Sequence, residues 1–305
     1  MTAARLTDLD PAQLNGHVPI AGNLAKRPVD TAKRGVIGGI LVIAAIGLLV
    51  GAVTSLVRWL GLPEADGPGL VHAQRTQAMM TTIGLGVLGI AAAAAAWWII
   101  AEHLRRIRRI HRLYRFAVGN GLEFVESQSG RHLDGPAFEV TGNTREHSPF
   151  VLGRVADGDF ELGGYVVRHV SSSRDRDGGG RTTTDMLRTR FSYLSIDIGA
   201  PLPTVRLHSR RAPRLRRADG LPKQSADAAL GRAFAVRGDG AGLERLADPR
   251  LREALLAHGD RHHVELHGTR VTLLTRAGAY ADEAGLRALL AAGDEIAPAV
   301  RAAFA

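Results

Sequence analysis

The sequence predicts an α+β protein in which an N-terminal two-helix transmembrane hairpin precedes a mixed strand and helix cytoplasmic domain. Three observations indicate this class: two long uncharged runs, a dense arginine stretch after the second run, and short alternating segments beyond residue 120. The chain has 305 residues, of which 45% are hydrophobic and none is cysteine. The sequence therefore offers no thiol nucleophile, disulfide or thiolate metal site.

Two uncharged runs are long enough to cross a lipid bilayer. Residues 35–57 and 79–100 contain no charged side chain, and helices of this length extend about 33–35 Å, against a hydrocarbon core of about 30 Å. Apolar helices buried in soluble proteins are usually shorter, at about 10–14 residues. We therefore expect both runs to be transmembrane helices.

Basic residues predict the orientation of these spans. Four precede the first span (Lys26, Arg27, Lys33, Arg34), six arginines follow the second (Arg105, Arg106, Arg108, Arg109, Arg112, Arg115), and two lie between the spans (Arg58, Arg75). Because short cytoplasmic flanks carry the excess of Lys and Arg, we expect both termini in the cytoplasm of a cell-membrane protein. Residues 1–34, which lack periodicity, are then a flexible cytoplasmic tail, and 58–78 is a short external loop.

The arginine stretch also predicts the partner of residues 101–120. More than half of the net charge of +9 lies in residues 101–115, directly after a span. At this position arginines can contact anionic lipid headgroups, at about 1 kcal/mol each. An apolar stripe (Leu104, Ile107, His111, Tyr114) predicts that the segment is an amphipathic juxtamembrane helix. We expect contact with lipid and no binding of nucleic acid.

Residues 121–305 are expected to form one cytoplasmic α+β domain. Alternating segments predict strands at 122–127, 137–140, 150–155, 159–170, 190–198, 204–208 and 233–236, and a hairpin at 262–275. Two segments rich in polar and basic residues, 171–185 and 208–227, are expected to be mobile loops. Asp248 and Pro249 suit the start of a helix at 248–258, and a final helix is expected at 281–305.

Glycine-rich motifs do not predict a cofactor site. GLGVLG (84–89) matches the spacing of a dinucleotide-binding loop but lies inside an uncharged span, without the required strand or acidic residue. Its glycines, with the pairs Gly35/Gly39 and Gly47/Gly51, are expected to allow close helix packing, and they leave a homo-oligomer open. DGGGRTTTD lacks the lysine of a phosphate loop and is expected to be a hairpin tip. No catalytic or cofactor-binding residue is predicted.

The segment HHVELH carries the clearest chemical signal. Strand alternation would place His263, Glu265 and His267 on one face, and these residue types bind zinc. In the simpler interpretation, Val264 and Leu266 fill the core and the other three form a water-exposed face. Two function classes follow: a domain that binds a partner or ligand without catalysis, which we prefer, and a membrane-tethered metal-dependent hydrolase that uses His263, Glu265 and His267.

Several stretches resemble a family of uncharacterised actinobacterial membrane proteins with two N-terminal spans and a domain of unknown function. These stretches are FELGGYVV (160–167), YLSIDIGAPLPTVRLHS (193–209), FAVRGDG (234–240) and LADPRLREALLAHG (246–259). The use of 36 arginines against 3 lysines fits a high-GC genome of that kind. The resemblance implies the same two-part organisation and supplies no activity.

Overall fold

A computed structural model describes residues 5–15, 28–60, 70–126, 128–129, 133–140, 142–174, 181–215, 220–240 and 242–305. The chain divides into two compact units. Residues 19–108 form the unit that we call the helix pair, and residues 1–18 with 109–305 form the domain. The middle of the predicted external loop (61–69) and part of the predicted tail (16–27) lie outside the described residues.

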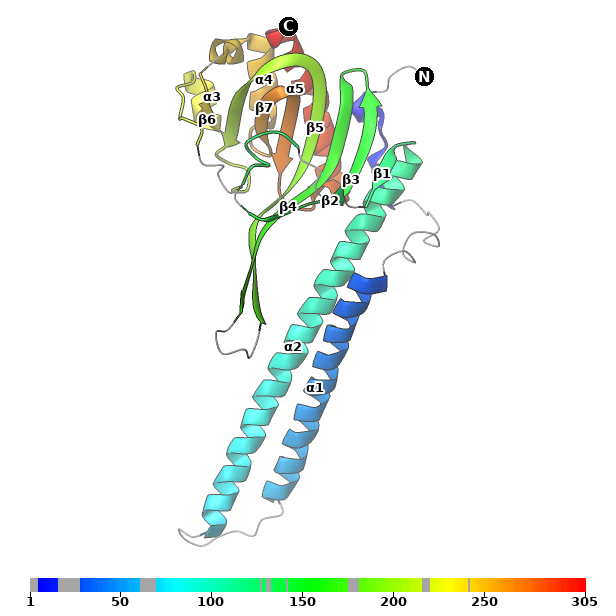
Figure 1. Ribbon diagram of the computed structural model, residues 1–305, viewed down its shortest axis with the longest axis vertical. Helices are drawn as coiled ribbons and strands as arrows, with labels where there is room; N and C mark the ends of the chain where they lie inside the picture. Colours follow the sequence, from blue (N-terminus) through cyan, green and yellow to red (C-terminus); the bar gives the residue numbers. More distant parts are fainter. Residues whose placement is uncertain are drawn as a thin grey trace. The chain divides into compact units, whose positions relative to one another are not determined.

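The helix pair consists of α1 (Pro28–Leu60) and most of α2 (Leu70–Gly119), which lie side by side in Figure 1. Among the described residues one helix, Met79–Gly119, is long and apolar enough to cross a membrane. The apolar part of α1 with described side chains, Val42–Arg58, is shorter. The predicted continuation of the second apolar run into a helix ending near Gly119 is confirmed.

Small residues lie between the two helices and large apolar residues point outward. Ala45, Ala52 and Ala96 are buried, and a Cβ atom added to Gly89 would lie 3.2 Å from the side chain of Leu49. The large side chains of the pair are exposed, for example Ile43 (72%) and Trp97 (74%). Close packing at glycine is thus confirmed for Gly51, which meets Leu85, and for Gly89, whereas Gly39, Gly47, Gly84 and Gly86 face open space.

A seven-stranded antiparallel sheet forms the centre of the domain, which confirms the α+β class. Its strands are β1 (Glu123–Val125), β2 (Gln128–Ser129), β3 (Thr144–Val155), β4 (Gly158–Arg174), β5 (Arg181–Ser209), β6 (Phe234–Gly238) and β7 (His263–Thr275). The order is β1-β3-β4-β5-β6, with β2 beside β3 and β7 beside β5. The long strand β5 pairs in turn with β4, β7 and β6 and thereby connects both ends of the sheet.

Several predicted strand boundaries were wrong. Segments 190–198 and 204–208 belong to one strand, and 137–140 belongs to none. The predicted hairpin at 262–275 is the single strand β7, which bends at Gly268 with φ 62° opposite the irregular pairing of β5. The predicted loop 171–185 is largely the end of the β4–β5 hairpin, whose strands extend beyond the rest of the sheet in Figure 1.

Helices cover one face of this sheet. They are α3 (Ala228–Ala233), α4 (Pro249–His258) and α5 (Glu283–Phe304). The predicted start of α4 is confirmed, because the Asp248 side chain accepts a hydrogen bond from the Leu251 N–H at 3.0 Å. The end of α2 joins the same core through Leu113, Phe116 and Ala117. Of the predicted stripe, Leu104 is 46% exposed, whereas the Tyr114 ring lies edge-on to Phe124, with centroids 5.3 Å apart.

The N-terminal segment Arg5–Asn15 packs against α5. It forms two 3-10 turns, η1 (Leu6–Asp8) and η2 (Pro11–Asn15), and buries Leu6, Leu9 and Leu14. The Asp294 carboxylate on α5 accepts hydrogen bonds from the N–H groups of Leu6 (2.8 Å) and Thr7 (2.9 Å). The expectation of a flexible tail is therefore wrong for these eleven residues, whose short turns carry no periodic signal in the sequence.

Candidate functional site: the polar face of the sheet

The sheet has a second face, away from α5, on which charged and polar side chains collect. On β7, Val264 and Leu266 pack into the α5 core, so His263 and Glu265 point to the opposite face. The predicted alternation in β5 is confirmed, since Leu194 and Ile196 also lie in the α5 core. We call the opposite face the polar face; it carries Glu161 on β4, Tyr193, Ser195, Asp197, Arg206 and His208 on β5, and His263, Glu265, Arg270 and Thr272 on β7.

Much of the polar face is buried, contrary to the expected water-exposed strand. His263 is 0% and Glu265 1% exposed. The segment 133–140, which we call the cover segment, packs here through Ala137 and Phe138. Its Phe138 ring lies edge-on to Tyr165, with centroids 4.9 Å apart, and Tyr165 donates a hydrogen bond to the Phe138 carbonyl at 2.8 Å. The cover segment belongs to no strand, so no periodic pattern in the sequence predicts that it covers this face.

The three residues of the metal hypothesis point to different partners. His263 Nδ1 accepts from the Ser209 N–H (3.0 Å), and its Nε2 lies 2.9 Å from the Pro213 carbonyl, to which it must donate. Glu265 accepts from the Ala137 N–H (2.9 Å), and His267 Nδ1 lies 3.0 Å from the Thr204 hydroxyl. No group of three or more metal-binding side chains comes together among the residues described. The hydrolase alternative therefore lacks its ligand set in this arrangement.

Three charged residues form a row across β6, β5 and β7. Arg206 is the register partner of Arg237 on one side and of Glu265 on the other. The Arg206 Nε lies 3.8 Å from the Glu265 carboxylate, and the two side chains are 4% and 2% exposed. Burial raises the pKa of Glu265 to about 7 although Arg206 and the Ala137 N–H oppose this, and burial also lowers the pKa of Arg206. Arg206 was not predicted as a site residue, although its alternation with Val205 and Leu207 places its side chain on the polar face.

A second buried polar group lies beneath the cover segment. Tyr193 donates a hydrogen bond to the Glu161 carboxylate, and His147 Nδ1 lies 3.2 Å from the Tyr193 hydroxyl. All three side chains are at most 1% exposed. Phe138 stacks over His147, and burial raises the pKa of the neighbouring Tyr165 to about 12. No local sequence pattern indicates this group, because its members come from three strands.

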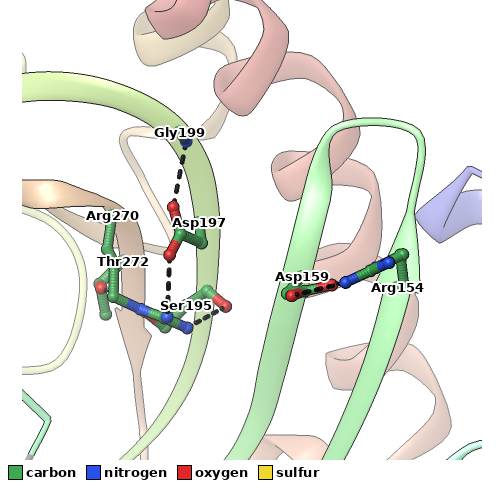
Figure 2. Close-up of polar contacts among 7 residues, drawn as sticks. All are labelled: Arg154, Asp159, Ser195, Asp197, Gly199, Arg270 and Thr272. Carbon is green, nitrogen blue, oxygen red and sulfur yellow. Dashed lines mark hydrogen bonds and ion pairs between the residues drawn. The ribbon is translucent and has the colours of Figure 1, made fainter.

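The other end of the polar face is open and its charges are matched. Figure 2 shows Arg270 between Ser195, to which its Nε donates at 2.8 Å, and Asp197, 3.7 Å from its Nη1. Arg154 and Asp159 form a two-bond pair on the exposed β3–β4 hairpin, and the hydrogen bond from Arg154 lowers the pKa of Asp159. Each of these arginines has its own carboxylate partner, whereas in the buried row two arginines, Arg206 and Arg237, lie beside the one carboxylate of Glu265.

The Ser195 hydroxyl and the His263 imidazole of the polar face are both held by neighbouring groups. The Ser195 hydroxyl contacts Arg270 and lies 3.0 Å from the Thr272 hydroxyl, and neither partner is a general base. His263, whose pKa is lowered chiefly by burial, uses both ring nitrogens in structural hydrogen bonds.

Comparisons with known proteins do not identify the chain. No protein-family model, curated protein or solved structure matches it. The resemblance to uncharacterised actinobacterial membrane proteins stays an expectation.

Proposed function

We propose that the protein is a two-pass membrane protein with both termini in the cytoplasm, and that its domain binds a ligand or partner without catalysis. The membrane part of the proposal rests on the side-chain packing within the helix pair and, separately, within the domain. The binding part rests on the charges of the polar face.

The outward side chains of the helix pair support a lipid environment. A soluble protein turns its large apolar residues inward, yet here Ile43, Val87 (61%) and Trp98 (66%) are exposed. The buried residues of the pair include the small Ala45, Ala52 and Ala96. In lipid, helices associate through small residues and expose large ones. Because Gly51 and Gly89 are already used within one chain, a homo-oligomer would use Gly47, Gly84 or Gly86.

The packing of Arg5–Asn15 on α5 carries the two-pass proposal. Leu6 and Leu14 are each 1% exposed, and the backbone of Leu6 is bonded to Asp294, 288 residues away. Both partners must lie on the same side of a membrane. The chain between them therefore crosses an even number of times, so α1 must cross if α2 does.

The arginines favour the cytoplasm as that side. Ten basic residues flank the two uncharged runs 35–57 and 79–100, against two between these runs, which follows the usual excess at cytoplasmic flanks. We assign headgroup contact first to Arg105, Arg106 and Arg108, which belong to the helix pair. Arg112 belongs to the domain, where it donates a hydrogen bond to the Ala281 carbonyl at 3.1 Å. A membrane-flanking position also accounts for this positive charge without nucleic acid.

Cysteine labelling tests the topology, since the natural chain contains no cysteine. Single variants Ala12→Cys, Gly67→Cys and Asp260→Cys would be treated with a membrane-impermeant maleimide in intact cells. We expect labelling of G67C alone, and of A12C and D260C only after the membrane is opened. Labelling of A12C and D260C from opposite sides would refute the even number of crossings, and labelling of both from outside would invert the orientation.

A further inference from the structure

Arg206 is a buried cation, and the described residues leave two of its nitrogens without a hydrogen bond. Its side chain is 4% exposed, and neither Nε nor Nη1 has a hydrogen-bond partner among the described residues. A guanidinium carries five donors, and leaving a buried charged donor unpaired is among the larger costs in a folded protein. Something outside the described chain must complete this site, and water or an anion would do so.

The neighbours of Arg206 favour an anion. Arg237, directly opposite on β6, brings a second positive charge, and like charges at paired positions repel. Arg237 donates to the Leu221 carbonyl and not to a carboxylate. The exposed Lys223 pairs with Arg237 at the edge of the row. Among the described residues, Glu265 is the one carboxylate in register with Arg206, and it already accepts a hydrogen bond from the Ala137 N–H.

We propose that the row Arg237–Arg206–Glu265 is a binding site for the carboxylate or phosphate group of a small soluble ligand. The inference rests on the proposed binding role of the domain and names the chemistry of its ligand. Arg206 would supply the buried donors, and Arg237, which is partly exposed, would lie at the entrance. An oxyanion there would relieve the repulsion between the two arginines and complete the hydrogen bonding of Arg206.

Glu265 links this site to protons. A bound anion repels the Glu265 carboxylate, so binding favours the protonated acid. The charged groups around this acid are Arg206 on β5, Glu139 on the cover segment and, beyond Arg206, Arg237 on β6; the stacked imidazoles of His208 and His263 lie alongside. Since the pKa of Glu265 is about 7 before the anion arrives, we expect anion binding to weaken as pH rises above 7, by up to tenfold per unit.

Titration calorimetry on the full-length protein in neutral detergent tests the site. The probes are acetate, which remains an anion throughout pH 6–8, and inorganic phosphate, each at ionic strength held constant with chloride. Arg206→Met should weaken binding at least tenfold, and Arg237→Met several-fold. Arg250→Met, at an exposed arginine on α4, is the matched control and should change binding less than twofold. Glu265→Gln should bind acetate at pH 8 as well as at pH 6.

The outcomes separate the anion site from the proposed topology. Absence of acetate and phosphate binding to the natural protein, or equal binding by R206M, R237M and R250M, would overturn the site and leave water as the partner of Arg206. A preference for one probe would decide between carboxylate and phosphate. Cysteine labelling measures the topology independently of anion binding. One proposal can therefore be refuted while the other stands.

Discussion

Two buried groups should make the stability of the domain depend on pH in opposite directions. Glu265 has a pKa raised from 4.5 to about 7, chiefly by burial. His262, 2% exposed just before β7, has a pKa lowered from 6.5 to about 4, chiefly by burial, with the charges of His258 and Arg261 adding to the effect. Each shift of 2.5 units corresponds to about 3 kcal/mol.

The signs follow from proton binding. Folded Glu265 holds its proton more tightly than the unfolded chain does, so its contribution is present below pH 4.5 and is lost as pH rises to about 7. Folded His262 holds its proton less tightly, so its contribution is present above pH 6.5 and is lost as pH falls to about 4. Between pH 4.5 and 6.5 the two residues should change the free energy of unfolding by nearly equal and opposite amounts per pH unit.

Single substitutions should separate the two slopes. Glu265→Gln removes the pH dependence that Glu265 causes. The free energy of unfolding of this variant, relative to that of the natural protein, should therefore increase by about 3 kcal/mol between pH 4 and 7.5. His262→Asn should show the opposite trend over the same range. Hydrogen exchange of the α5 amides in full-length protein, corrected for the intrinsic exchange rate at each pH, measures both differences. Differences that do not vary with pH in either variant would refute the buried titration of these residues.

Three further substitutions test packing. Asp294→Ala should release Arg5–Asn15, at about 1–3 kcal/mol for the lost acceptor, seen as faster hydrogen exchange at Leu6 and Thr7 while β5 amides stay protected. Asp248→Ala removes the cap of α4 and should lower the free energy of unfolding by about 1 kcal/mol, measured by the same exchange method. Gly89→Leu should separate α1 from α2 and speed exchange in the helix pair, whereas Gly86→Leu, facing open space, should not.

The sequence predicted the elements whose residues repeat with a period. The alternation of residues 190–198 placed Leu194 and Ile196 on one face of β5, and Asp248 with Pro249 identified the start of α4. The orientation of His263 and Glu265 also followed from alternation, but their burial did not. Burial depends on the cover segment, an irregular stretch more than 120 residues away along the chain.

The missed parts of the site are pairings between distant segments. Arg206 is distinguished from other strand residues by Arg237, which lies opposite it on β6. No local sequence pattern predicts the register between β5 and β6. Likewise Leu6, Leu9 and Leu14 read as isolated apolar residues of a polar tail, because their partner α5 ends the chain. Sequence periodicity predicts on which face of a helix or strand a residue lies. It does not predict which other segment packs against that face.

The contact between Arg5–Asn15 and α5 also has a consequence for biogenesis. Leu6 leaves the ribosome well before its acceptor Asp294, which is made 288 residues later. At about 5–20 residues per second, Leu6 waits roughly 15–60 s for its partner. Both apolar helices are synthesised during this interval, so we expect membrane insertion to precede completion of the domain. A chain that stops before α5 would keep Leu6, Leu9 and Leu14 uncovered, and we expect proteases to cut such molecules faster than molecules that contain α5.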